Sequence, residues 1–303
     1  MTERQDRKLV MLALILVTIF AAAPGTVRAQ AVLLPDKITT RGGGTSVASI
    51  CEETRAPSPL KEALRLVCLR KGTVSADDTV RNAIIIGFVG GFVKHDDAMH
   101  PEVQFAAYLR ERYLTAVHAE VFANHEGQKA LRQVLRLLDT NGDGVLTPEE
   151  KEKARIIIYG HSWGASQTVS LARELGRLGI PVLLTIQVDS ITKPGQQDST
   201  IPPNVENAVN FYQPRGLLHG RSIIVAADPS RTKILGNFRM TYQGHRINCD
   251  NYRWLVRVLN RPHHEIENDP RVWDQLAWLI DSELSITRST TQPSSASQSM
   301  LLK

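Results

Sequence analysis

The sequence predicts an α/β fold: a mostly parallel sheet with helices on both faces. Continuous apolar runs at residues 82–92, 155–160 and 180–190 are typical of strands that are buried on both faces. Segments with helical periodicity alternate with these runs, at residues 101–113, 125–138 and 166–179. This alternation favours right-handed crossovers within one parallel sheet.

The first 29 residues have the pattern of a secretory signal peptide. A basic start with Arg4, Arg7 and Lys8 precedes an uncharged apolar stretch, Leu9 to Ala23, and small residues lie around Ala29. The apolar stretch is short for a membrane span, which needs about 20 residues. We therefore expect cleavage after Ala29, no stable membrane anchor in the mature chain, and an exported protein, either periplasmic or secreted.

Residues 30–80 form a polar, glycine-rich lead-in that contains two cysteines. An exported chain meets an oxidising compartment, where Cys51 and Cys68 are candidates for a disulfide that staples the lead-in. Cys249 is then left over, and the sequence alone does not fix which cysteines pair.

The remaining elements complete one domain, which we place at residues 81–286. Three more runs have the pattern of strands: residues 115–124, 205–213 and 221–229. Residues 269–284 have the pattern of a final helix with a proline in its first turn. The Ser/Thr-rich residues 287–303 predict a disordered tail.

Composition indicates a globular protein and argues against nucleic acid as a partner. Hydrophobic residues make up 42% of the 303 residues and charged residues 22%, which suits a sizeable core. The net charge is +5, but no run concentrates lysine and arginine on one segment, as phosphate binding requires.

A serine between two glycines connects the predicted strand 155–160 to the helix that follows. Such a sharp turn forces Ser162 into an unfavourable backbone geometry, and side chains at Gly160 and Gly164 would collide with the helix and the neighbouring strand. The helix N-terminus also points backbone N–H groups at the serine, which favours developing negative charge. The turn is therefore expected to present Ser162.

The stretch GHSWGA around Ser162 resembles the nucleophile elbow of the α/β-hydrolase superfamily. The resemblance covers residues 82 to 285 and includes a glycine-terminated early strand, an aspartate after a later strand and a late histidine. It implies a serine hydrolase of the lipase, esterase or thioesterase-like kind. In that chemistry Ser162 is the nucleophile, followed along the chain by an acid and then a histidine.

The resemblance also implies the partners of the serine. His263 matches the histidine of thioesterase-like members, which is followed three residues later by Ile or Met, here Ile266. The neighbouring His264 is the alternative, and we expect both in a loop before the last helix. The acid is Asp189, directly after one apolar strand, or Asp228, after a later one. Either carboxylate would fix the imidazole tautomer.

The oxyanion hole is expected to use two backbone N–H groups. One belongs to Trp163, the residue after the nucleophile. The other is assigned to Phe88, with Val89 as the alternative, because nearby glycines let this backbone approach a ligand closely. The His-Gly signature of the family is absent from this strand. His161, inside the elbow, is expected to be structural.

Residues 139–150, DTNGDGVLTPEE, match the twelve-residue loop of an EF-hand. Gly144 stands at the position of the sharp bend, and helical segments flank the loop. The oxygen donors at the ligand positions are Asp139, Asn141, Asp143, Val145 (through its carbonyl), Thr147 and Glu150. The spacing predicts a single bound Ca²⁺ with a structural role, since sensor EF-hands work in pairs.

These features together predict an exported serine hydrolase that cleaves a carboxylic ester, either of a lipid or of a small acyl chain, through an acyl-enzyme. Two other interpretations remain open from the sequence. One is a non-catalytic calcium-binding scaffold on a hydrolase fold, and the other is an amidase or thioesterase with the same triad. Residues 191–204 and 229–262 are expected to be insertions that shape the pocket.

Overall fold

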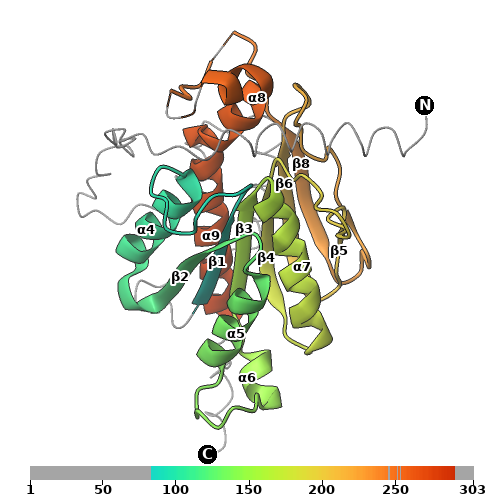
Figure 1. Cartoon of the computed structure of the whole chain (residues 1–303). Coiled ribbons are helices and arrows are strands. Elements are labelled where there is room, and N and C mark those ends of the chain that lie inside the picture. Colours follow the sequence, from blue (N-terminus) through green and yellow to red (C-terminus); the bar gives the residue numbers. More distant parts are fainter. Residues whose placement is uncertain (1–82, 245, 251, 253, 291–303) are drawn as a thin grey trace, which may run out of the picture.

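The computed structural model describes residues 83–290, apart from residues 245, 251 and 253 (Figure 1). The predicted signal peptide, the lead-in and the Cys51–Cys68 pair lie outside the described residues, as does most of the predicted tail. Cys249 is buried as a free thiol. No helix in the described part of the chain combines the length and apolar character that a membrane crossing requires.

A parallel six-stranded sheet forms the centre of the molecule, in the order β2-β1-β3-β4-β6-β8. Its strands are β1 (Ala83–Val89), β2 (Val117–Ala123), β3 (Ile156–His161), β4 (Val182–Val188), β6 (Val205–Tyr212) and β8 (Lys233–Arg239). A separate two-stranded sheet joins β5 (Thr200–Ile201) to β7 (Val225–Ala226). Strands β1, β3 and β4 are buried along their whole length, which explains their continuous apolar sequences.

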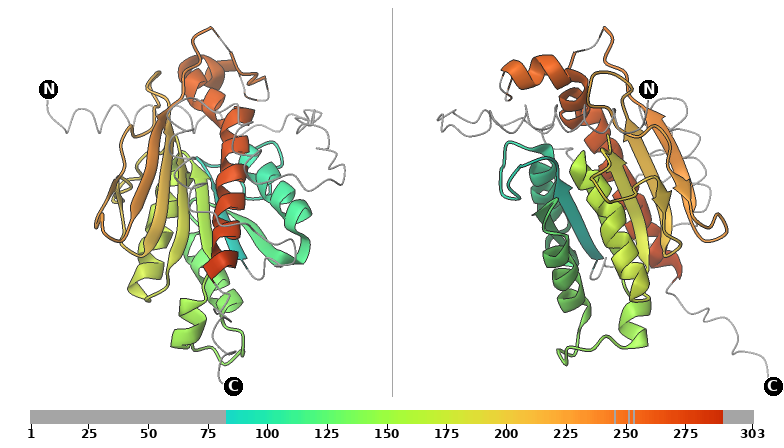
Figure 2. Two further views of the ribbon diagram at one scale, coloured as in Figure 1. Left: turned by 180° about the vertical axis from the view of Figure 1, so that it is seen from behind. Right: turned by 45° about the vertical axis from the view of Figure 1, so that its right-hand side comes forward.

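Helices cover both faces of the sheet, as Figures 1 and 2 show. They are α4 (Pro101–Tyr113), the 3-10 turn η1 (Leu114–Ala116), α5 (Gly127–Leu138), α6 (Pro148–Glu152), α7 (Trp163–Arg177), α8 (Trp254–Glu267) and α9 (Pro270–Thr290). Helices α4 and α9 pack on one face, where Phe105 and Leu276 meet Tyr159. Helices α5 and α7 pack on the other, where Val134 and Val169 share a core. The predicted fold class, a mostly parallel sheet with helices on both faces, is confirmed.

The strand predicted at residues 221–229 does not belong to the six-stranded sheet, so this prediction is wrong. Only Val225 and Ala226 pair there, with β5, while β8 forms the outer strand of the large sheet. The sequence of β8, KILGNFR, lacks a continuous apolar run because the strand has one neighbour and only two buried residues. This strand lies inside residues 229–262, which were expected to be a pocket-shaping insertion.

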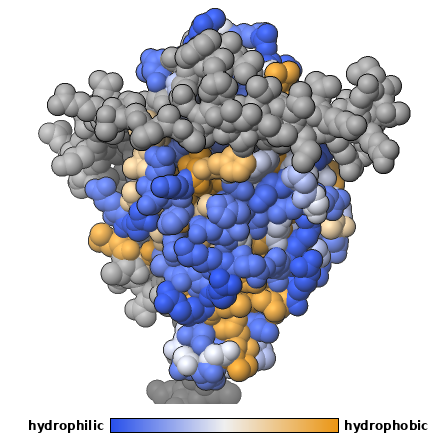
Figure 3. All heavy atoms as spheres, viewed as in Figure 1, coloured by the Kyte–Doolittle hydropathy of each residue, from blue (hydrophilic) through white to orange (hydrophobic). Residues whose placement is uncertain are grey.

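The outer surface of the molecule is largely hydrophilic on the face seen in Figure 3, with apolar patches between hydrophilic regions. Helix α9 continues to Thr290, beyond the domain end expected at residue 286. The carboxyl ends of the parallel strands, where α7 begins, lie at the opposite edge of the sheet from α6 (Figure 1). Clusters of functional side chains in parallel sheets gather at that carboxyl edge.

Candidate functional site

Ser162 occupies a strained turn between β3 and α7. Its backbone has φ 57° and ψ −123°, a region that residues with side chains rarely adopt. The two flanking glycines are required by space. A Cβ atom at Gly160 would lie 2.6 Å from the carbonyl carbon of Gly164, and one at Gly164 would overlap the carbonyl oxygen of Phe88. The predicted strand–turn–helix around Ser162 is therefore present in the structure.

The loop after β1 lies directly against the serine. A Cβ atom at Gly90 would come within 2.9 Å of Ser162 Cβ, and Gly91 has φ 48°. Phe88 instead lies inside β1, with partners in both neighbouring strands, and Val89 is its last residue. Of this segment, the structure thus brings Gly90 rather than Phe88 to Ser162. Trp163 is the first residue of α7, so its N–H has no partner within the helix.

Asp189 follows β4, the strand next to β3, and is fully buried. The Ser162 amide donates to the Val188 carbonyl at 3.0 Å, so the serine and the aspartate lie at adjacent strand ends. The Asp189 carboxylate accepts hydrogen bonds from the Gln213 amide (3.1 Å), Gln213 Nε2 (2.9 Å) and the Gly220 amide (2.7 Å). Gly220 has no room for a side chain beside this carboxylate.

His263 approaches the same carboxylate, with 2.6 Å between its Nδ1 and Asp189 Oδ2. In the neutral ring that donates to Asp189, Nδ1 carries the proton and Nε2 is the acceptor. The His263 ring also contacts the His161 ring, with 4.5 Å between centroids. Ser162 itself keeps 9% of its surface exposed, and His263 keeps 4%.

The alternative histidine, His264, and the alternative acid, Asp228, make other contacts. His264 Nδ1 is 3.3 Å from Glu267 Oε2, and the Asp228 carboxylate accepts from the amide and hydroxyl of Ser230 in an exposed turn. Both histidines belong to α8 rather than to the predicted loop. That helix is broken by non-helical dihedrals at Asn260 and contains Pro262, which explains why the sequence looked irregular there.

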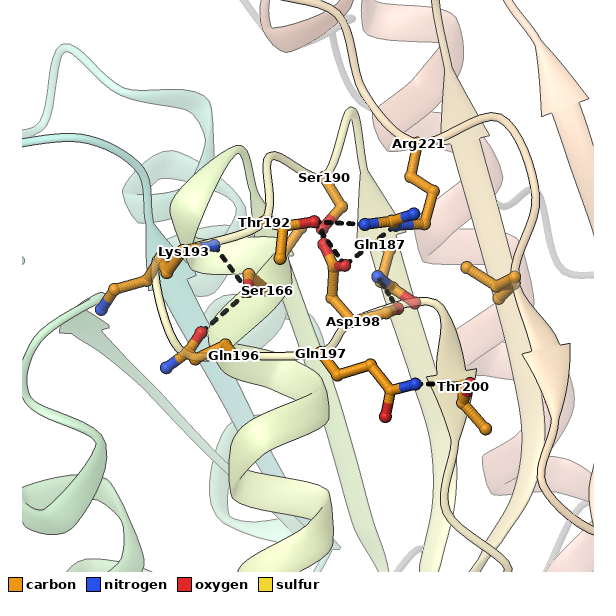
Figure 4. Close-up of polar contacts among 12 residues, drawn as sticks. Ser166, Gln187, Ser190, Thr192, Lys193, Gln196, Gln197, Asp198, Thr200 and Arg221 are labelled. Carbon is orange, nitrogen blue, oxygen red and sulfur yellow. Dashed lines mark hydrogen bonds and ion pairs between the residues drawn. The ribbon is translucent and has the colours of Figure 1, made fainter. Parts of the chain in front are cut away.

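Two positioning features carried no motif in the sequence. Gln213 supplies two of the donors to Asp189, and the only signal for it is a polar residue directly after a strand. The loop after β4 is held by Asp198, which is fully buried and accepts from Ser190 Oγ (2.5 Å), Thr192 Oγ1 (2.7 Å) and Arg221 Nε (2.9 Å) (Figure 4). A cavity of about 480 Å³ lies beside this network.

A second group of ionisable side chains, largely buried, lies next to His263, where the His161 ring contacts the His263 ring. His100 Nδ1 and Glu267 Oε1 are 2.7 Å apart, and His161 Nδ1 lies 3.6 Å from Glu102 Oε1 and 3.7 Å from Glu267 Oε2. Burial and the charge of Glu267 raise the pKa of Glu102 to about 8. Burial acts to lower the pKa of His100, but the hydrogen bond and charge of Glu267 raise it to about 9. Burial lowers the pKa of His161 to about 3.

Helices α5 and α6 and the loop between them form a helix–loop–helix at the amino edge of the sheet, at the end opposite the start of α7 (Figure 1). The Asp139 carboxylate accepts from the amides of Gly142 (2.8 Å) and Gly144 (2.9 Å), both of which have positive φ. The Glu150 carboxylate bonds to residues 140 and 147, joining the two ends of the loop. Those hydrogen bonds lower the pKa of Glu150 to about 2.

The sequence matches no protein-family model and no curated protein. Among solved structures the chain is similar to a cutinase-like protein from Cryptococcus sp., with TM-score 0.38 and 11% identity over 70% of this chain and 98% of that one. It is also similar to an esterase from the archaeon Pyrobaculum calidifontis in two structures. One has TM-score 0.24 and 14% identity over 49% of this chain and 53% of that one. The other, a monoclinic form, has TM-score 0.30 and 12% identity over 77% and 94%. These identities are too low to transfer an activity, so the chemistry must come from this chain's own residues.

Proposed function

We propose that the chain is an exported serine hydrolase that cleaves carboxylic esters. The observation that carries the proposal is the 2.6 Å contact between His263 Nδ1 and Asp189, at the strand end next to the strained turn of Ser162. Ser162 Oγ attacks the ester carbonyl while His263 Nε2 takes its proton. The imidazolium then gives that proton to the leaving alcohol. In the second half of the reaction water attacks the acyl carbonyl while His263 Nε2 takes its proton. Ser162 Oγ then leaves the carbonyl, regains the proton and releases the acid.

The negative oxygen of the tetrahedral intermediate would be stabilised by backbone N–H groups. The amide of Trp163 at the start of α7 is one donor. The second donor is assigned to the amide of Gly91 rather than to that of Phe88, because Gly90 packs against Ser162 while its own amide interacts with the Glu102 carboxylate. Asp189 keeps the proton on Nδ1 of His263 and stabilises the imidazolium.

An apolar acyl group suits the entrance to this site. Phe92 is 64% exposed, and its ring packs edge-on against Trp163, with 5.5 Å between centroids. An exposed aromatic pair beside the nucleophile offers apolar contact area to a substrate chain. We therefore assign the substrate as a lipid or small acyl ester. Because residues 1–29 have the pattern of a signal peptide, we place the hydrolysis outside the cytoplasm, after their removal.

The test is covalent labelling combined with ester turnover. A fluorophosphonate probe should label the wild-type protein, and Ser162→Ala should abolish both labelling and hydrolysis of p-nitrophenyl esters of graded chain length. Ser166→Ala, which alters a buried hydroxyl one turn further along α7, is the matched control and should keep both. Folded wild-type protein that neither reacts with the probe nor cleaves any ester would favour a non-catalytic scaffold. Cleavage of amides or thioesters alone would reassign the substrate class.

We also propose that residues 139–150 hold a structural Ca²⁺. The donor set suits a hard cation, and the Asp139 carboxylate is already oriented by two loop amides. Asp139, Asn141, Asp143, Thr147, Glu150 and the carbonyl of Val145 would hold the ion, which would tie α5 to the segment that leads into β3. Its role would be stability alone, since the loop lies at the edge of the sheet opposite Ser162.

Calcium removal tests this site directly. With calcium at about 100 times its Kd, EGTA should lower Tm by about 5–10 °C. Asp139→Asn should remove that response, whereas Glu149→Gln, a neighbouring exposed carboxylate outside the ligand positions, should keep it. An identical melting curve with and without EGTA in the wild type would contradict calcium binding.

A further inference from the structure

We propose that the side chains of His100, Glu102, His161 and Glu267 form a binding site for a divalent transition metal of the zinc class. The site is separate from the proposed triad and from the calcium loop. It joins the start of α4, the end of β3 and the end of α8, three segments that are far apart in the sequence.

The first support is the burial of unpaired donor atoms. Glu102 is fully buried, and no described residue forms a hydrogen bond of ordinary geometry to its carboxylate oxygens, although the backbone amides of Glu102 and Gly90 interact with the carboxylate and lower its pKa. Leaving a carboxylate without partners in the interior is costly, so such groups are paired or coordinate a metal. Glu267 is 2% exposed and lies in the same cluster. A dication between the two carboxylates would balance their charges.

The second support is the spacing of the donors. One atom each from His100, Glu102 and Glu267 lies within 4.8 Å of the others. His161 Nδ1 is 3.6 Å from Glu102 Oε1 and 3.7 Å from Glu267 Oε2. Ligands about 2.1 Å from a tetrahedral ion are about 3.4 Å apart, so His100, Glu102 and Glu267 form the core of the site, and the His161 ring would have to move toward the ion to complete it. The ion would replace the proton between His100 and Glu267, and those two side chains would move apart to receive it.

The donor types select the class of metal. Two imidazole nitrogens and two carboxylates suit zinc better than calcium or magnesium, which take oxygen ligands only. Four protein ligands make a closed site, which is the structural rather than the catalytic kind. Because the His161 ring lies on the His263 ring, the ion would fix the imidazole proposed as the catalytic base by holding its neighbour.

Metal content and stability test the site without reference to catalysis. The full chain is purified with excess calcium, so that residues 139–150 do not respond, and its zinc is measured by plasma mass spectrometry. We expect about one zinc per chain. Phenanthroline should remove it and lower Tm, and Zn²⁺ alone should restore both. Substitution with Co²⁺ should give the visible absorption of a tetrahedral site.

Two variants decide whether the named residues hold the ion. Glu102→Gln should weaken Zn²⁺ binding by more than about 100-fold, and His100→Gln, at the most exposed ligand, gives the same test if the first variant does not fold. Glu120→Gln is the matched control, because Glu120 also contacts a histidine, His118, but on the open surface of β2. Failure of the wild type to bind Zn²⁺, or equal binding by wild type and both ligand variants, would overturn the proposal. Ester hydrolysis can persist or fail independently of either result.

Discussion

Two buried carboxylates at the same edge of the sheet have opposite surroundings. Asp189, at the end of β4, accepts hydrogen bonds from two backbone amides and one side-chain amide and contacts His263. Glu102, in the first turn of α4, receives no hydrogen bond of ordinary geometry from the described residues, although the backbone amides of Glu102 and Gly90 interact with it. Both side chains are fully buried.

The two carboxylates therefore differ in how firmly neighbouring groups hold them. A carboxylate with several donors is held in one orientation, which is what a triad acid needs. Glu102 lacks such a set of donors, and burial with the nearby charge of Glu267 raises its pKa to about 8. What distinguishes the two is the number of close hydrogen bonds that hold them.

The largest expected effect comes from disrupting the contact between Asp189 and His263. Asp189→Asn keeps the size of the side chain but removes its charge and favours the wrong tautomer of His263. We expect kcat for ester hydrolysis to fall by about 10⁴-fold, with the fold intact by circular dichroism. Asp228→Asn is the matched control, because that aspartate lies in an exposed turn, and it should keep wild-type kcat. The reverse ranking of the two variants would make Asp228 the acid.

Gln213 should have a smaller effect on the same carboxylate. Gln213→Ala removes the 2.9 Å side-chain bond to Asp189 Oδ2, and a bond to a charged group is worth about 1.5–3 kcal/mol. We expect kcat to fall by about 10–100-fold. Because Asp189 would then interact more strongly with the imidazolium, the acidic limb of the kcat/KM profile should move to higher pH.

The control for Gln213 is another glutamine that donates to a carboxylate. Gln128 Nε2 bonds to Glu174 on the surface, 2.7 Å away, and Gln128→Ala should leave both kcat and the pH profile unchanged. A Gln213→Ala protein that loses only thermal stability, with an unmoved pH profile, would show that this glutamine does not position Asp189.

The features that the sequence predicted are those that depend on a short segment of the chain. Strands β1, β3 and β4 are buried on both faces, so each reads as one apolar run. The turn at Ser162 needs glycine on both sides for reasons of space, and that need is visible as a motif. Asp189 became a candidate because it directly follows an apolar run, and the structure places its carboxylate 2.6 Å from His263 Nδ1.

The parts that the sequence did not predict depend on distant contacts. The edge strand β8 has a mixed sequence, because only one side of it is paired. His100 and Glu267 lie 167 residues apart, and no spacing rule joins them. Phe88, predicted as an oxyanion donor, lies within β1, which runs one residue past it, and the backbone that packs against Ser162 is at Gly90.

A third buried carboxylate, Glu283, tests whether burial beside a like charge also raises a pKa away from the site. Glu283 lies on α9 near Glu206 and Lys233, and Asn207 donates to it. Burial, with the charge of Glu206, raises its pKa to about 7. The folded chain therefore holds a proton that the unfolded chain loses near pH 4.5. Stability from this group is present below that pH and is lost as pH rises to about 7.

Urea unfolding at pH 5 and pH 8 measures this effect, which concerns stability and not catalysis. Between these two values the group should cost the wild type about 3 kcal/mol of unfolding free energy. Glu283→Gln, which cannot ionise, should be less sensitive to pH by that amount, so its advantage over the wild type should be larger at pH 8 than at pH 5. Glu111→Gln, at an exposed position on α4, should keep the wild-type dependence. If the Glu283→Gln and wild-type values differ equally at both pH values, burial beside Glu206 does not hold Glu283 neutral, and the same explanation for the raised pKa of Glu102 loses its support.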